Sequence, residues 1–549
     1  MSKIKIFALG GLNEIGKNMY VVEVDNDIFV FEAGLKYADD KMLGIDYIIP
    51  SYDYLIQNKN RIKGIFISHG HDEQMGALPD MLNELNGVNI YATKFTMEII
   101  KRELEESKID YKHLIEIKPH KKISFGSNSI FPISLTHSIP DNVGYVLNTK
   151  DGAIVYTGNF MFDSSMLGAY KTDIGKLAYV GKQGVLCLLS ESMYAEKKGF
   201  TAPNNRITSV VNEVLTHSNR LLVGVFPNQF YKIQEILSSA NKAKRNVVVV
   251  GKRLLDTINK AIELNYIDFD KTRIKGISHI NDENIVVLIA DEREKPFSNF
   301  LRIIKGYDKF LKVNKNDTVL FVSPIYPGME KSSTKLFDGI ARIGAELIDI
   351  SSKYYSHHAS SEDLMLMINL MEPKYYMPVN GEFRHEIANK NVAIMAGMKK
   401  ENVLCKLNGQ VVKFVKGKLV ETEEKIKTDE ILIDGTIASD VGELVLKDRE
   451  ILSDNGVVVA VLTIDKITKK MLQNVQIQSR GFIYVKENID VVKEASEIAT
   501  KVAKENIKPN FIDYNKVKLG IRDELGKYFY NEIGTKPMIL LIIQEIWKF

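Results

Sequence analysis

Residues 64–76 limit most strongly what this chain can form. An apolar run leads directly into His69 and His71, and residues 75–85 have the apolar spacing of a helix. The pattern predicts a strand, a short loop that carries both histidines, and then a helix, and binding groups usually lie on such loops. Gly70 adds no side chain between the two imidazoles, so both can turn towards one cation. A pair of solvated loop histidines explains the His-x-His pattern alone about equally well.

The length of the chain bounds its architecture. At 549 residues it is too long for one hydrophobic core, and usual domain sizes predict about three or four domains. Hydrophobic residues make up 45% and charged residues 26%, which is typical of a soluble globular protein. The formal net charge of +3 is too small to indicate nucleic-acid binding by itself, so any such contact requires a local basic groove.

The cysteine content and the first residues predict a compartment. Only Cys187 and Cys405 occur, both in apolar surroundings, which favours buried thiols in a reducing compartment over a disulfide framework. Residues 1–11 lack the features of a signal peptide, and no apolar run approaches the ~20 residues that span a bilayer. We therefore expect a cytoplasmic protein without membrane association.

Alternating elements predict two kinds of α/β domain. Short strands are expected at residues 4–9, 19–24 and 28–32, and strands and helices then alternate up to Ser190, as in a sandwich whose two packed sheets are covered by helices. Between residues 205 and 350, five apolar runs are separated by stretches of helix length. These runs lie at 221–226, 246–250, 285–290, 319–323 and 346–350. This regularity predicts a parallel sheet with crossover helices.

Several motifs resemble one family. His69-Gly70-His71-Asp72-Glu73-Gln74 resembles the His-x-His-x-Asp-His signature of metallo-β-lactamase-fold hydrolases, with Glu73 in the place of the Asp and Gln74 in the place of the last His. Further motifs follow in the family's order, namely Thr136-His137-Ser138, Thr157-Gly158-Asn159, Ser323-Pro324-Ile325-Tyr326-Pro327-Gly328, Ser356-His357-His358-Ala359-Ser360, Pro378-Val379-Asn380 and Gln478-Ser479-Arg480-Gly481. Together they resemble the ribonuclease J family, the β-CASP branch of these hydrolases that cuts RNA. The similarity is greatest to the second, catalytically degenerate ribonuclease J paralogue of bacteria that carry two copies.

The resemblance implies an α/β architecture in three parts: a metallo-β-lactamase αββα sandwich, an inserted β-CASP parallel-sheet domain, and a small C-terminal α/β domain. A charge-rich segment at residues 421–440 predicts a connector, and strands are expected beyond it at 457–464, 482–485 and 538–543, with two helices between 491 and 530. The expected division is 1–205 and 351–424 for the two parts of the sandwich domain, 206–350 for the β-CASP domain, 425–447 for a linker and 448–549 for a C-terminal association domain.

The resemblance also implies a metal site. In the family two divalent metals lie side by side and act together on a phosphodiester. His69, His71 and His137 match the histidines of the first site and are all present. Gln74, Asn159 and Asn380 stand where the family has ligands of the second metal, including the bridging Asp at Asn159, and Glu73 alone keeps an anionic oxygen. Because neutral amides bind Zn²⁺ or Mn²⁺ weakly, we expect at most one divalent metal, Zn²⁺ or Mn²⁺, or none.

The phosphate-binding positions are altered as well. His358 matches the family histidine that contacts the scissile phosphate, and Ser356 and Ser360 flank it as predicted substrate-binding residues, although His357 replaces a glycine. The turn at 226–230 and the acidic loop at 291–296 replace loops through which the family approaches phosphate. Acidic side chains there would repel it.

These expectations combine into one functional hypothesis. The family hydrolyses RNA as a 5′-to-3′ exonuclease and an endonuclease, in mRNA decay and rRNA maturation. With an eroded two-metal site, this chain is expected to be weak or inactive alone, and to act as partner subunit of an active ribonuclease J paralogue, besides forming homodimers or tetramers. Two alternatives stay open: a genuine one-metal ribonuclease with Glu73 and His358 as catalytic residues, and a metal-free RNA-binding or scaffold subunit.

Overall fold

The computed structural model describes residues 2–547 except 39–41, 292–296, 323–324, 326–327, 351–355, 436, 439–442, 484–487 and 509–510. The chain divides into two compact units, one formed by Met1–Tyr37 and Asp46–Ala438, the other by Ala38–Ile45 and Ser439–Phe549. No helix of the described residues is long and apolar enough to cross a membrane.

The first unit contains the predicted sandwich. Its first sheet has eight strands in the order β22-β21-β1-β2-β3-β6-β7-β8, which are Lys418–Val420, Val412–Val415, Lys3–Gly10, Met19–Val24, Asp27–Phe31, Ile62–Phe66, Ile90–Thr93 and Leu114–Ile117. Its second sheet has six strands in the order β20-β13-β12-β11-β10-β9, which are Tyr375–Val379, Val185–Glu191, Gly152–Tyr156, Val143–Thr149, Asn128–Ser134 and Ile123–Phe125. Phe31 of the first sheet packs on Tyr145 and Tyr156 of the second, with ring centroids 5.8 and 5.7 Å apart. This aromatic core fixes the spacing between the two layers.

Helices cover the outer faces of the sandwich. The longer ones are α4 (Lys94–Glu106), α5 (Ile174–Gln183), α11 (Ser361–Met371) and α12 (Phe383–Met395). The helix predicted at 75–85 is instead two short helices, α2 (Asp72–Met75) and α3 (Leu78–Met81). Pro79 lies in the first turn of α3, where its missing N–H costs no hydrogen bond, so the chain starts a new helix there.

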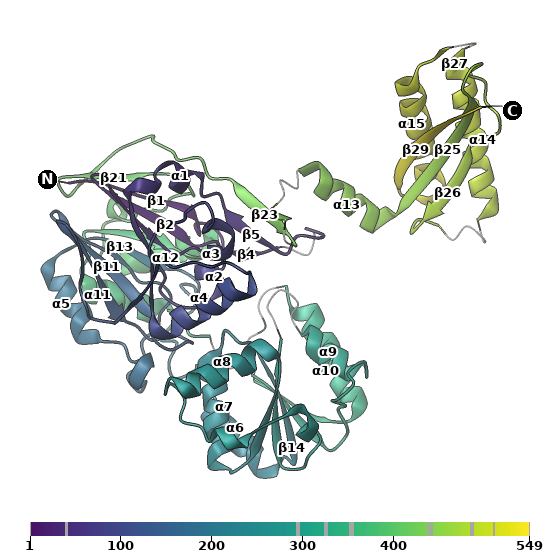
Figure 1. The fold of residues 1–549 in the computed structure, drawn as a ribbon. Helices are drawn as coiled ribbons and strands as arrows, with labels where there is room; N and C mark the ends of the chain where they lie inside the picture. The colour runs from purple at the N-terminus through teal and green to yellow at the C-terminus, as the bar shows by residue number, and fades with distance from the viewer. Residues whose placement is uncertain are drawn as a thin grey trace. The chain divides into compact units, whose positions relative to one another are not determined.

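The parallel sheet predicted between residues 205 and 350 is present. Its order is β16-β15-β17-β14-β18-β19, with bounds Ile274–Lys275, Asn246–Val250, Ile285–Ala290, Arg220–Val225, Asp317–Phe321 and Glu346–Asp349, and all five pairings are parallel. Figure 1 shows helices α6 (Thr208–His217), α7 (Phe230–Lys242) and α8 (Lys252–Glu263) on one face, and α9 (Ser298–Ile304) and α10 (Glu330–Ile343) on the other. Because both faces are covered, the central strands are continuous apolar runs.

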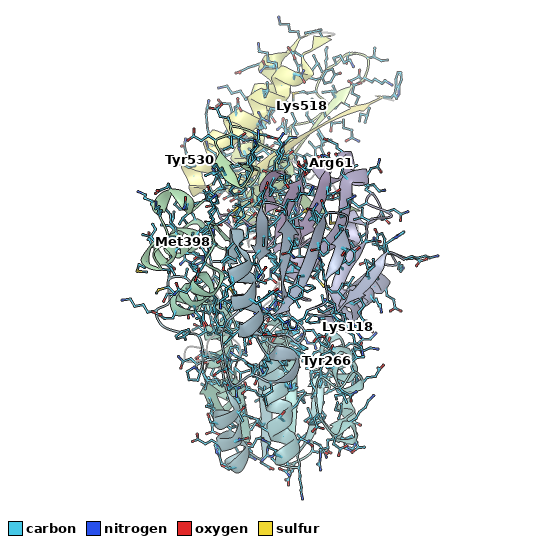
Figure 2. All side chains as sticks on the ribbon, turned by 90° about the vertical axis from the view of Figure 1, so that its left-hand side faces the viewer. Arg61, Lys118, Tyr266, Met398, Lys518 and Tyr530 are labelled. Carbon is cyan, nitrogen blue, oxygen red and sulfur yellow. The ribbon has the colours of Figure 1, made fainter. Side chains whose placement is uncertain are left out.

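Polar contacts join the parallel-sheet domain to the sandwich within the first unit. Tyr266, labelled in Figure 2, donates from its hydroxyl to Asp141 Oδ2. Arg102 of α4 donates to Thr257 Oγ1 of α8 across 2.6 Å, and Arg253 of α8 pairs with Glu103 of α4.

The predicted connector is partly folded. Within 425–447, β23 (Glu430–Asp434) pairs antiparallel with β5 (Tyr47–Pro50), so the first unit extends through Ala438. The strand gains ladder hydrogen bonds and buries Ile433 to 1% exposure, which outweighs the charge-rich composition that favoured a loop. Helix α13 (Glu443–Asn455) then begins the second unit.

The second unit packs α14 (Ile489–Asn506) and α15 (Tyr514–Ile533) against a three-stranded sheet. The strand order is β26-β25-β29, with bounds Gln476–Arg480, Val457–Asp465 and Met538–Ile546. The strand predicted at 482–485 lies earlier, as β26, and residues 484–485 lie outside the described ones. Edge strand β26 pairs, within the described part of the chain, with β25 alone and exposes Gln476, Gln478 and Arg480, so it lacks the apolar run that guided the prediction.

Candidate metal centre

Three histidines from two loops meet at one end of the sandwich. His69 and His71 follow β6, where His71 immediately precedes helix α2, and His137 follows β10. All three are buried, and one ring nitrogen of each lies within 4.8 Å of those of the other two. The ring centroid of His69 lies 4.5 Å from that of His71 and 4.6 Å from that of His137. The structure thus brings together the three histidines that the sequence analysis named as metal ligands.

Hydrogen bonds orient the imidazoles for a metal ion. His137 donates from Nδ1 to the backbone oxygen of His357 across 2.6 Å, so Nε2 keeps its lone pair. That Nε2 is buried without a hydrogen-bond partner among the described residues. His69 Nε2 and His71 Nδ1 are 3.1 Å apart, close to the roughly 3.3 Å that two tetrahedral ligands on Zn²⁺ require. The donor set therefore fits a metal that prefers imidazole.

Electrostatics favour the metal-binding form of these histidines. Burial, and then the neighbouring imidazoles, hold the pKa of His69 and of His137 well below the ordinary value. Both rings are neutral at neutral pH, which is the state that binds a cation.

Supporting residues hold the histidine loop in place. Ser68 Oγ lies 2.8 Å from His69 Nδ1, and the Ser68 N–H donates to Glu32 Oε2 across 3.1 Å. Glu32 is fully buried, and burial raises its pKa to about 8. Ser138 Oγ donates to the backbone oxygen of Asn228 across 2.7 Å, which connects the loop after His137 to the parallel-sheet domain. Ser68 and Ser138 were missed by sequence reasoning, although each adjoins a predicted ligand.

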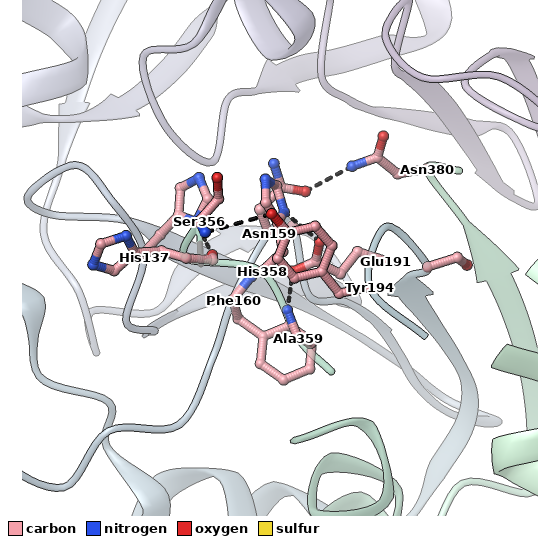
Figure 3. A network of polar contacts seen from close by, with 12 residues as sticks. His137, Asn159, Phe160, Glu191, Tyr194, Ser356, His358, Ala359 and Asn380 are labelled. Atoms are coloured by element: carbon pink, nitrogen blue, oxygen red, sulfur yellow. Dashed lines mark hydrogen bonds and ion pairs between the residues drawn. The ribbon is translucent and has the colours of Figure 1, made fainter. Parts of the chain in front are cut away.

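The three positions that the resemblance assigns to a second metal also lie together, and all three carry amide side chains. Asn380 donates from Nδ2 to Asn159 Oδ1 across 2.7 Å, as Figure 3 shows. Gln74 is 1% exposed, and neither of its amide atoms has a hydrogen-bond partner among the described residues. These three residues line one small cavity together with Glu73 and His71. Asn159 follows β12 and Asn380 follows β20, the two parallel neighbours of β13 in the second sheet, so the ends of these strands position them.

His358 lies at the edge of the same cavity and pairs with a carboxylate. Its Nδ1 is 2.7 Å from Glu191 Oε2, and its ring centroid is 5.2 Å from that of His137. The other carboxylate oxygen of Glu191 accepts from the backbone N–H groups of Phe160 and Ala359 at 2.5 and 3.3 Å (Figure 3). Glu191 is thereby fixed, and it fixes the orientation of His358 in turn.

The two predicted substrate-binding serines have different surroundings. Ser360 is fully buried, and its hydroxyl bonds to Gly199 O at 2.8 Å and to Asp363 Oδ2 at 3.0 Å, where it caps α11. Its hydroxyl therefore contributes to the N-terminal cap of α11. Ser356 is also buried, and its backbone N–H donates to Tyr194 OH across 3.4 Å.

Asp291 and His357, two altered residues at the expected phosphate-binding positions, make contacts within the protein. Asp291 is 3% exposed, and its carboxylate accepts from the backbone N–H groups of Asn299 and Phe300 in the first turn of α9. It stabilises that helix terminus, and the repulsion of phosphate by this loop stays a prediction. Residues 292–296 of this loop lie outside the described residues. His357 occupies space beside Tyr231 of α7, with ring centroids 5.4 Å apart.

The fold and the site define a class of protein, the metallo-β-lactamase-fold hydrolases with a β-CASP insertion. Residues 50–174 match the beta-lactamase superfamily domain, 218–340 the ribonuclease J beta-CASP domain, 343–401 the Zn-dependent metallo-hydrolase RNA specificity domain and 444–546 the ribonuclease J C-terminal domain. The chain is 36% identical to Ribonuclease J2 of Bacillus subtilis (strain 168) over 549 residues, covering 99% of each chain. It is 35% identical to Ribonuclease J 2 of Staphylococcus aureus (strain NCTC 8325 / PS 47), covering 99% of this chain and 98% of that one. The chain belongs to the ribonuclease J family, and the predicted resemblance to the second paralogue is confirmed.

A solved structure shares the fold. A protein of unknown function from Enterococcus faecalis V583 superposes with a TM-score of 0.53 at 14% sequence identity, covering 75% of this chain and 100% of that chain.

Proposed function

We propose that this protein acts in RNA processing with a site that holds one transition metal at most, has weak or no ribonuclease activity alone, and works as the partner subunit of an active ribonuclease J paralogue. The observation that carries this proposal is the pairing of Asn380 with Asn159 at 2.7 Å. In the family, these positions supply an imidazole and the bridging carboxylate of the second metal. Here the amide of Asn380 donates a hydrogen bond to the amide oxygen of Asn159.

The chemistry of the remaining ligands supports this proposal. His69, His71 and His137 match a Zn²⁺ or Mn²⁺ site, whereas amide oxygens are neutral and poor ligands for these metals. A Zn²⁺ on three histidines would supply a Lewis acid and a bound water of near-neutral pKa. The second metal, which would stabilise the departing oxygen of a phosphodiester, has lost most of its ligands.

RNA is the proposed ligand because of the family and the surroundings of the site. The match to an RNA specificity domain covers 343–401, which includes His358. A cleft beside His71 is lined by Arg102 of the sandwich and by Arg253 and Asn228 of the parallel-sheet domain. Guanidinium and amide groups of this kind bind phosphate, although Asp72, Glu73 and Glu103 line the same cleft and Glu103 already pairs with Arg253.

The second unit is the proposed association module. Its sheet packs Ile539, Leu541 and Ile543 towards the helices, while Leu540 and Ile542 on the opposite face are 47% and 52% exposed. Among the described residues strand β29 pairs with β25 alone, so it is also an edge of the sheet. Burying this face against a second copy or a paralogue would remove apolar surface from water.

A one-metal ribonuclease remains the second candidate, and one observation favours it. His358, oriented by Glu191, and Glu73 line the same cavity as His71, so an acid-base pair could stand beside a single metal. The metal-free RNA-binding subunit is the third.

An RNA decay assay on protein purified free of any paralogue separates the three candidates. Metal content is measured on the same sample, and Mn²⁺ and Mg²⁺ are compared. Partner-subunit function predicts near-background decay, with RNA binding retained. Decay that disappears in the His137→Ala variant would establish the one-metal enzyme. RNA binding that is unaffected by chelation in a protein without bound metal would establish the metal-free subunit.

A further inference from the structure

We propose that the amide-lined cavity beside the histidines binds a monovalent cation such as K⁺, held by side-chain oxygens of Gln74, Asn228 and Gln229 together with the Glu73 carboxylate. This site is distinct from the three-histidine site in both its ligands and its metal class. It goes beyond the proposed function, because cation binding requires neither RNA nor a paralogue.

Three residues that line this cavity carry buried side-chain oxygens without hydrogen-bond partners among the described residues. Its lining includes Glu73 and Gln74 from the sandwich and Asn228 and Gln229 from the parallel-sheet domain. Gln74 Oε1, Asn228 Oδ1 and Gln229 Oε1 are buried and accept no hydrogen bond from any described residue. Gln74 and Gln229 are only 1% and 4% exposed. A buried amide oxygen without a partner is destabilising, so three such residues lining one cavity indicate a ligand that pairs with oxygen.

Both sides of the cavity are fixed in position. The backbone N–H of Gln229 donates to Phe226 O across 2.9 Å, and Ser138 holds the backbone oxygen of Asn228 at 2.7 Å. Gln74 N donates to His71 O across 3.0 Å at the start of α2. The oxygens are therefore presented by ordered backbone, which lowers the entropic cost of binding a ligand.

The charge of the lining selects a cation over an anion. Glu73 is acidic, and His71 and His358 are the other titratable residues of the lining. Among the unpartnered side-chain atoms of Gln74, Asn228 and Gln229, three are acceptors and one, Gln74 Nε2, is a donor, so acceptors that match a cation predominate.

The ligand count then selects a monovalent cation over a divalent one. Ca²⁺ sites use several carboxylates, and Mg²⁺ keeps much of its water and requires near-ideal octahedral geometry. One carboxylate among neutral amide oxygens balances a single positive charge. Neutral carbonyl oxygens are also the ligands that replace the hydration shell of K⁺ in selectivity filters.

Thermal unfolding of the protein in EDTA tests this proposal, since the chelator removes divalent metals and leaves K⁺ free. At constant ionic strength, replacing choline chloride by about 0.15 M KCl should raise the unfolding midpoint of the first unit by about 2 °C or more. Gln74→Leu and Gln229→Leu should each lose this increment. Gln57→Leu, an exposed glutamine at the end of α1 (Asp53–Gln57), is the matched control and should keep it.

Anomalous scattering from Tl⁺, a K⁺ surrogate, locates the cation in the unsubstituted protein and does not depend on the folding of any variant. The expected result is a Tl⁺ peak between Gln74 and Gln229. Equal midpoints in KCl and choline chloride, a KCl increment that persists in both leucine variants, or Tl⁺ bound elsewhere but not in this cavity would each overturn the proposal.

Discussion

Asn380 donates a hydrogen bond from its side chain to Oδ1 of Asn159 across 2.7 Å, which joins residues 221 positions apart in the chain. The bond occupies the Nδ2 atom of one residue and the Oδ1 atom of the other. A divalent metal at this place would have to break it and would gain only neutral oxygens in return. The pair therefore opposes the binding of a second transition metal at this place.

Restoring the ligands should rebuild the two-metal site. The variant Glu73→Asp, Gln74→His, Asn159→Asp and Asn380→His should bind a second Zn²⁺ or Mn²⁺ and cleave RNA at least about tenfold faster than the unsubstituted protein. Asn380 has φ +51°, a backbone region in which His is also found, so that substitution is tolerated. Metal analysis and an RNA decay assay measure the two effects.

Single changes serve as the controls for the restored site. Each of the four alone should do little, because a two-metal site works as a unit. If the quadruple variant binds two metals but still does not cleave RNA, the altered phosphate loops are the main cause of the lost activity. A single substitution that restores full activity would contradict the account.

Ser68→Ala should weaken metal binding at the histidine site. When His69 Nε2 faces the metal, its Nδ1 carries the proton and donates to Ser68 Oγ at 2.8 Å. Loss of such an orienting bond typically lowers affinity by about 10- to 100-fold, whereas His137→Ala removes a ligand and should cost more. Zn²⁺ titration against a competing chelator measures both, with the exposed Ser107→Ala as control. Unchanged affinity in Ser68→Ala would show that the bond does not orient the ring.

Glu386→Gln should change how stability depends on pH. Glu386 is 1% exposed and accepts from the Asn13 N–H at 2.8 Å, and its burial raises the pKa from 4.5 to about 8. The folded state binds the proton of the Glu386 carboxyl more tightly than the unfolded state does. The contribution of this proton to the free energy of unfolding is therefore complete below about pH 4.5 and is lost as the pH rises through about 8. Glutamine keeps the acceptor and does not ionise, so the variant should be more stable than the unsubstituted protein near about pH 9 and nearly equal to it near about pH 4.5. Thermal midpoints at both pH values test this, and an equal difference at both would refute it.

Leu540→Glu combined with Ile542→Glu should dissociate oligomers. Both side chains lie on the open face of the C-terminal sheet, and charges there would have to be desolvated at an interface. Light scattering should show the mass falling to that of a single chain, whereas Leu167→Glu, at a residue 79% exposed in the first unit, should leave it unchanged. A double variant with unaltered mass would place association elsewhere.

Local patterns predicted most of the fold. The runs at 246–250 and 285–290 coincide with β15 and β17, because strands buried on both faces need continuous apolar residues. The pattern failed at β23, a charge-rich strand stabilised by its pairing with β5, and at the polar edge strand β26. Such strands owe their existence to partners distant in sequence, which periodicity does not detect.

The sequence predicted those site residues whose side-chain type alone indicates metal binding. His69, His71 and His137 were found from motifs, and they meet as expected. The assignment of Ser360 to helix capping and of Asp291 to the first turn of α9 depends on side-chain direction, which a motif does not contain. The contact between Ser138 and Asn228 depends on how two domains pack.

The stoichiometry of bound transition metal tests the central claim most directly. Protein dialysed against excess Zn²⁺ or Mn²⁺ and then freed of loosely bound ions should retain at most one ion per chain, and His137→Ala should retain none. Two tightly bound transition-metal ions per chain of the unsubstituted protein would contradict the account.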